Sequence, residues 1–146
     1  MISCKEMALI LDRAALEAKA GLEVPTKALM EFLAEMAKGF IGHYQAGWAP
    51  LKPSTIADKT KKGFAPPDNP LLRTGDMRGS IDGKAEATSY GAEGAVGSES
   101  KIALYQEMGT SRGIPPRPFL ATAMMHSQKQ AAVLFGQFAL KLLSGR

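Results

Sequence analysis

The chain has 146 residues and a formal net charge of +4, with 45% hydrophobic and 22% charged residues. This composition excludes a disordered chain, and the length allows one modest core, so we expect a single folded domain over 1–146. Cys4 has no partner for an internal disulfide, the charges before residue 22 exclude a signal peptide, and no apolar run reaches the roughly 18 residues of a membrane span.

Two amphipathic helices are expected first. The spacing predicts a helix from about Lys5 to Ala20 that ends at Gly21, and a second helix with Pro25 in its first turn that fades between Gly42 and Gly47. Residues at three-and-four spacing form the expected core faces: Met7, Ile10, Leu11, Ala14, Ala18 and Leu22, then Leu29, Phe32, Leu33, Met36, Phe40 and Tyr44.

A long loop follows from Gly47 to Pro70. Its prolines withhold backbone donors and its lysines add like charge, so we expect a mobile segment with few ways to pair its backbone or bury side chains. One helical turn is expected within it, from Thr55 to Lys61. A loop of this length is typically either functional or disordered in isolation.

The rest of the chain alternates short elements with a last helix. Thr74 is a candidate N-cap for a short helix at 75–80, and 81–98 predicts an antiparallel hairpin that turns near Gly91. Residues 102–108 fit either a strand or a helical turn, and 109–118 is loop. A helix is expected over 119–143, with Phe119 buried at its start. The predicted fold is α+β: a small antiparallel sheet packed with amphipathic helices.

Residues that carry chemistry are few. His43 and His126 lack the spacing of metal ligands, and Cys4 lies in a terminal segment that is a poor platform for a nucleophile. No glycine motif for a phosphate cradle is present. We therefore expect no catalytic, cofactor-binding or metal-binding residues, and no enzyme.

The lysine-rich stretch from Lys52 to Lys62 leaves one alternative open. Its cations suit phosphates, and Trp48 and Phe64 on either side suit stacking on bases. This favours a small basic DNA-binding accessory protein as the alternative function, against the plainer interpretation of a solvated loop between apolar anchors.

Two ordered segments resemble a known family. They are Trp48-Ala49-Pro50-Leu51-Lys52-Pro53-Ser54-Thr55, leading to Leu71-Leu72-Arg73-Thr74-Gly75, and Tyr105-Gln106-Glu107-Met108-Gly109-Thr110, leading to Pro116-Arg117-Pro118-Phe119-Leu120. From about Phe32 to Ala123 the chain resembles the virion morphogenesis, or tail-completion, family of Mu-like phages. It is also similar to the tail-component (head–tail joining) family of lambda-like phages. It departs from the pattern at 101–104, where a tyrosine–alanine pair is expected.

The resemblance implies an α+β subunit of a ring, commonly sixfold, in the neck or tail of a phage or prophage particle. Its partners would be further copies of itself, neighbouring neck, tail or connector proteins, and DNA passing through the channel, with no membrane. Its location would be the virion, or the host cytoplasm during assembly or as a prophage product. Assembly contacts are expected in the loops, at Trp48, Leu51, Lys52, Lys59, Lys61, Lys62, Arg73, Thr110, Arg112 and Arg117.

Overall fold

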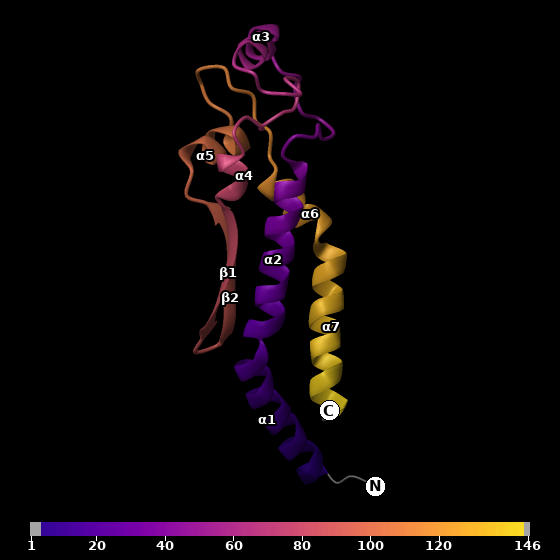
Figure 1. Cartoon of the computed structure of the whole chain (residues 1–146). Helices are drawn as coiled ribbons and strands as arrows, with labels where there is room; N and C mark the ends of the chain where they lie inside the picture. Colours follow the sequence, from indigo (N-terminus) through magenta and orange to yellow (C-terminus); the bar gives the residue numbers. More distant parts are fainter. Residues whose placement is uncertain (1–3, 145–146) are drawn as a thin grey trace.

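The computed structural model describes residues 4–144 and has the expected α+β architecture (Figure 1). In the described chain, seven helices accompany one antiparallel hairpin. Their bounds are α1 Cys4–Gly21, α2 Glu23–Phe40, α3 Pro53–Lys61, α4 Asp76–Gly79, β1 Ile81–Thr88, β2 Gly91–Ser98, α5 Lys101–Met108, α6 Leu120–His126 and α7 Gln128–Ser144.

Helix α2 is the spine of the molecule. The hairpin packs along one side of it and α7 along the other, while α3, α4, α5 and their loops gather at its C-terminal end (Figure 1). The core therefore lies around the second half of α2. It consists of Leu33, Ala34, Ala37, Ile41, Trp48, Met77, Ile81, Ala103, Phe119 and Ala123. Phe119 is fully buried, which confirms the expected core position.

The first two helices meet at a bend. Pro25 has no N–H to donate to the end of α1, so the helical hydrogen-bond ladder is interrupted there. The carbonyl of Leu22, the residue between the helices, accepts hydrogen bonds from the backbone N–H and the hydroxyl of Thr26 at 3.2 and 2.7 Å. Beyond this bend, α1 extends past the end of the hairpin (Figure 1).

The prediction that the apolar face of α1 belongs to the core is wrong for the isolated chain. No residue of α1 is buried, and Met7, Ile10 and Leu11 are each about half exposed. The physical reason is that α1 lies beyond most of the chain and touches α7, β2 and α2 only along its edge. The apolar stripe exists, but this chain alone does not cover it.

Two local expectations also need correction. The predicted last helix breaks at Ser127, whose hydroxyl donates to the carbonyl of Met124 at 2.8 Å and thereby ends α6 before α7 begins. The residue that precedes α4 is Gly75, with a φ of 93°, rather than Thr74. Gly75 takes this position because it adopts the left-handed conformation without a Cβ penalty.

The hairpin register runs from Ile81 opposite Ser98 to Thr88 opposite Gly91, so the two connecting residues are Ser89 and Tyr90. Gly91, near which the turn was expected, is the first residue of β2. Ile81, Gly83 and Ala85 alternate with exposed polar residues, as expected for a strand with one covered face.

Glycines let the hairpin approach α2 closely. A Cβ built on Gly83 would lie 2.3 Å from the carbonyl oxygen of Met30, and one on Gly94 would lie 2.7 Å from the side chain of Met30. The low β-propensity of this strand pair therefore has a packing cause, since a larger residue has no room against the helix backbone.

We predict that Gly83→Ala lowers the free energy of unfolding by roughly 1–3 kcal/mol, because the methyl group overlaps helix backbone that cannot yield easily. Gly97 is a matched control in the same hairpin, with nothing within 4 Å of a built Cβ. Gly97→Ala should change the free energy by less than about 0.5 kcal/mol. Urea titrations followed by circular dichroism measure both, and equal losses would contradict the close approach.

Candidate functional site

Residues 43–78 and 101–118 form the end of the molecule that carries the candidate residues, called here the cap. The segment 47–70 within it has far more partners than expected. It contains the nine-residue helix α3, Trp48 belongs to the core, and Pro70 is buried. Its ends are held by backbone and side-chain bonds, including that from Gly42 N–H to the carbonyl of Pro70 at 2.8 Å. The expectation that few of its groups find partners is wrong, whereas its mobility stays a prediction.

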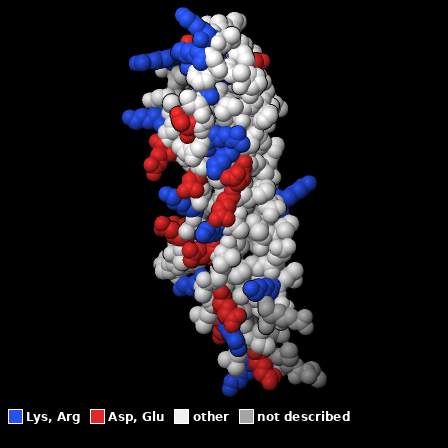
Figure 2. All heavy atoms as spheres, in the orientation of Figure 1, with Lys and Arg blue, Asp and Glu red and all other residues white. Residues whose placement is uncertain are grey.

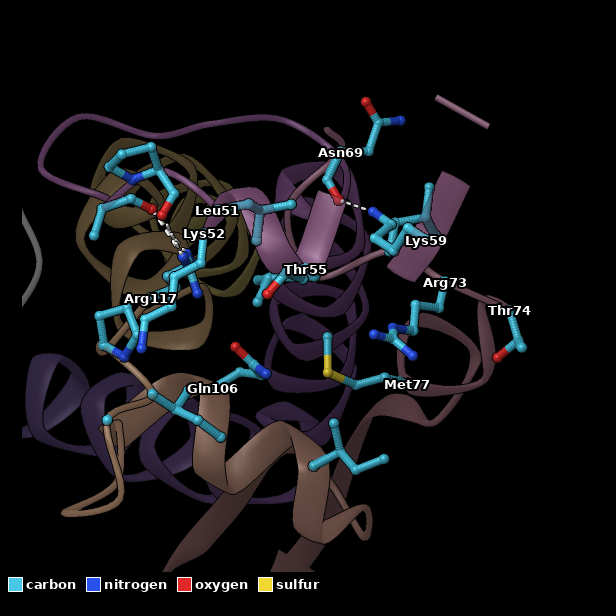
Figure 3. A pocket seen from close by; sticks show the side chains of 18 of the residues that line it. Leu51, Lys52, Thr55, Lys59, Asn69, Arg73, Thr74, Met77, Gln106 and Arg117 are labelled. Carbon is cyan, nitrogen blue, oxygen red and sulfur yellow. Dashed lines mark hydrogen bonds between the residues drawn. The ribbon is translucent and has the colours of Figure 1, made fainter. Parts of the chain in front are cut away.

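Arg117 holds the start of this segment. Its guanidinium donates to the carbonyl of Ala49 at 2.9 and 3.1 Å and to that of Pro50 at 3.3 Å, and its side chain is buried (Figure 3). Its backbone N–H donates to the carbonyl of Gln106 at 2.7 Å. One residue thus joins α5, the loop before α6 and the beginning of the 47–70 segment.

Glu107 holds together the place where α5 and the start of α6 meet, called here the Glu107 corner. Its carboxylate accepts three backbone N–H groups at the start of α6, from Phe119 at 2.8 Å and from Leu120 and Ala121 at 2.9 Å each. These donors have no intrahelical partner, and a carboxylate at the positive end of the helix dipole is favourable. Glu107 therefore caps a helix from a distant position in the chain and fixes Phe119 in the core.

Between these elements the cap forms a partly open cavity of about 940 Å³. Its volume lies in the range of pockets that bind small molecules, roughly 300–1,000 Å³. Its lining is apolar with cations in excess: five lysine or arginine side chains and one carboxylate. The charged lining residues are Lys52, Lys59, Arg73, Arg112, Arg117 and Asp76, and the large apolar ones are Leu51, Leu71, Leu72, Met77, Ile102 and Ile114.

Lys59 is only 2% exposed, although the sequence suggested a solvated cation in the loop. Its ammonium donates to the carbonyl of Asn69 at 2.6 Å, which ties α3 to the end of the segment (Figure 3). Burial lowers the pKa of Lys59 below its ordinary value of 10.5, and the nearby Arg73 lowers this pKa further, while Asp68 opposes the shift. This lysine is a structural tie and not a surface charge.

The remaining cations of the cap differ in their availability. Asp58 pairs with Lys62 at 2.8 Å and with Arg73 at 2.9 Å, and the hydrogen bond from Lys62 holds the pKa of Asp58 below its ordinary range. Lys52 and Arg112 make no ion pair with any residue that the structure describes. These two are therefore the cavity cations best placed to meet an incoming anion.

Six of the ten sequence-predicted assembly residues line this cavity: Leu51, Lys52, Lys59, Arg73, Arg112 and Arg117. The other four do not. Trp48 is in the core, Lys61 is exposed at the end of α3, and Lys62 is exposed directly after it. Thr110 closes the loop that presents Arg112, because its N–H donates to the carbonyl of Ile114 at 2.9 Å.

Sequence reasoning missed Gln106 as a cavity residue. It lies on α5 and faces Thr55 across the cavity, and its amide oxygen is buried without a hydrogen-bond partner in the described chain (Figure 3). A helix period over 101–108 would have placed Ile102 and Gln106 on one face, four residues apart. The residues at 102–108 fit a strand as well as a helical turn, so the sequence does not select this helical face.

No family model, curated protein or solved structure matches this chain. Over residues 4–144 no group of three or more histidine, cysteine, aspartate or glutamate side chains is placed to hold a metal ion. Within the same range, none of the helices combines the length and apolar character needed to cross a membrane.

We predict that Arg117→Met lowers the free energy of unfolding by roughly 2–4 kcal/mol, because the carbonyls of Ala49 and Pro50 lose a buried charged donor while the apolar stem is kept. Arg112→Met, an exposed change in the same loop, should cost less than about 0.5 kcal/mol. Hydrogen exchange should also show faster exchange over 47–52 in the Arg117 variant alone. Unchanged exchange there would contradict the anchoring role.

A second prediction follows from the lowered pKa of Lys59. Between that lowered pKa and 10.5, the unfolded chain binds more protons than the folded one, so the contribution of Lys59 to stability rises with pH in this window. The difference in unfolding free energy between the wild type and Lys59→Met should therefore be flat near pH 7 and increase towards pH 10.5. Urea titrations at a series of pH values measure this difference, and a decrease towards pH 10.5 would contradict the buried position of Lys59.

Proposed function

We propose that this protein is a structural subunit of a phage or prophage particle, which assembles with copies of itself into a ring at the neck or tail and completes head–tail joining. The observation that carries the proposal is α7. Between residues 131 and 143 its only polar side chains are Gln137 and Lys141, yet none of its residues is buried. A helix that is apolar on nearly every side belongs inside a structure, and one chain covers α7 on one side only, where it packs against α2 and α1.

The exposed positions show where the missing contacts lie. Val133, Leu140 and Leu143 are 50%, 67% and 70% exposed on the side of α7 opposite Leu134 and Phe138. Single exposed apolar residues are common, whereas a row of them along one helix face indicates an interaction surface.

Helix α1 adds a second surface of the same kind. Leu9 and Leu16 are 62% and 70% exposed, at positions two helical turns apart. They lie opposite the partly covered stripe of Met7, Ile10 and Leu11. Burying α1 and α7 against neighbouring copies would supply the partners that the isolated chain lacks, and contacts between different surfaces close into a ring when the rotation allows it.

The distribution of charge is compatible with a ring around DNA. The cap contains nine lysine or arginine residues and four acidic ones, whereas α2 and the hairpin together carry six acidic residues and three lysines. In Figure 2, basic side chains gather at the cap end of the visible face, and acidic ones at the level of the hairpin and α2. Cations that are spread over a surface attract a polyanion without binding it tightly.

The same basic cap favours a second candidate function, that of a DNA-binding accessory protein. Binding of that kind would weaken steeply with added salt. It is the weaker candidate, since Lys59 and Arg117 are buried and bonded to carbonyls, and Lys62 and Arg73 share Asp58.

The decisive experiment removes the gene from a phage that carries it and restores it in variant form. Removal should leave heads and tails without joined particles in electron micrographs, and wild type and Lys141→Glu should both restore joining. Leu140→Glu should not, because a charge in the middle of an apolar contact weakens it by at least about tenfold. Lys141→Glu is the matched control, since it changes an exposed charge on the next residue.

The same variants should be examined in solution by analytical ultracentrifugation. Wild type and Lys141→Glu should form a discrete, concentration-dependent oligomer, and Leu140→Glu should remain monomeric with unchanged helical circular dichroism. Complete virions in the absence of the gene would refute the assembly role.

A further inference from the structure

The tip of the hairpin is an exposed aromatic residue between two carboxylates. Tyr90 is 93% exposed at the turn. Glu86 and Glu93 lie directly opposite each other in the register, and neither makes an ion pair with a described residue. Like charges at opposed positions destabilise a strand pair, so this arrangement is unfavourable unless cations from elsewhere approach it.

The cavity of the cap has the opposite chemistry. Its walls are apolar, with Leu51, Leu72 and Ile114 among them, and the side chains of Lys52 and Arg112 make neither an ion pair nor a hydrogen bond with any described residue, unlike those of the other cavity cations. The Lys52 ammonium lies 3.8 Å from a Cβ built on Gly113, the residue after Arg112, so Lys52 reaches the loop that carries Arg112. Two unpaired cations beside an apolar space match two unpaired carboxylates beside a tyrosine.

The tip of a chain cannot reach its own cap. Strand β1 begins beside α4 in the cap and runs away from it along α2 for eight residues, a length of roughly 25 Å (Figure 1). The close packing of Gly83 against Met30 keeps it from folding back. Any contact between the tip and the cavity therefore joins two molecules.

From this complementarity we infer that the hairpin tip of one subunit enters the cap cavity of a second copy of this chain. Tyr90 occupies the apolar interior, and Glu86 and Glu93 meet Lys52 and Arg112 at the rim. The inference rests on the proposed assembly and adds the identity of the two surfaces that join. Such a contact is head-to-tail, the kind that propagates around a ring.

The unpartnered amide oxygen of Gln106 agrees with this occupant. A buried carbonyl oxygen without a donor costs free energy, and no donor among the described residues bonds to this oxygen. A turn of the amide towards the cavity would let this oxygen accept a hydrogen bond from the hydroxyl of Tyr90.

Cysteine cross-linking tests the contact in the full-length protein. In a Cys4→Ser background, chains with Tyr90→Cys are mixed with chains carrying Ile114→Cys, at a concentration where oligomers are present. Mild oxidation should link the two chains at least about tenfold faster than it links Tyr90→Cys to Lys61→Cys. Lys61 is the control because it is exposed on the cap but does not line the cavity.

Charge reversal tests the role of the rim. The pair Glu86→Lys and Glu93→Lys, placed in the Tyr90→Cys chain, should slow cross-linking by at least about tenfold, because like charges then face each other. The pair Lys52→Glu and Arg112→Glu in the partner chain should have the same effect alone and should restore the rate when combined with the first pair. Glu23→Lys with Glu31→Lys, two exposed reversals on α2, should change little.

The outcomes separate this inference from the proposed function. Oligomers that assemble normally but link Tyr90→Cys no faster to the cavity than to Lys61→Cys overturn the tip-to-cavity contact and leave the assembly role standing. Charge reversals that fail to compensate also overturn it, since a foreign acidic protein or DNA would then be the better occupant of the rim. A protein that stays monomeric overturns both proposals.

Discussion

The carboxylate of Glu107 meeting three N–H groups of α6 is the contact on which the rest of the cap depends. It joins α5 to α6 and sets Phe119 in the core. Arg117 lies two residues before Phe119, and its guanidinium donates to the carbonyls of Ala49 and Pro50. A single buried corner therefore positions segments that are almost 70 residues apart in the sequence. The cavity lies beside this corner, with Gln106 and Arg117 among its lining residues.

The secondary structure was largely predictable because it depends on local patterns. Periodic apolar residues placed α1 and α2, and alternation in 81–98 placed the hairpin although its residues are small. The break at Ser127 was not predictable from periodicity, because the apolar spacing continues across it. The expected burial of α1 failed for a different reason: an amphipathic pattern states that a face will be covered, but not whether the same chain covers it.

The candidate site was predictable in location but not in roles. Both loops expected to carry assembly contacts do meet, and they enclose the cavity. However, Lys59 and Arg117 looked like surface cations, and they are buried and bonded to backbone carbonyls. A sequence shows that a residue is charged, while its partner across the fold depends on long-range packing. The motif around Tyr105 to Thr110 and Pro116 to Leu120 thus has a structural meaning here, as the two halves of the Glu107 corner.

The glycine contact between the hairpin and α2 has a mechanical consequence. At Gly83 the strand rests against the backbone at Met30, so no flexible side chain lies between strand and helix at this position to absorb a displacement. A pull on the tip is passed directly to α2, and through Ile41 and Trp48 to the cap at its end. A force applied at the hairpin tip would therefore be transmitted to the cap with little deformation of the subunit.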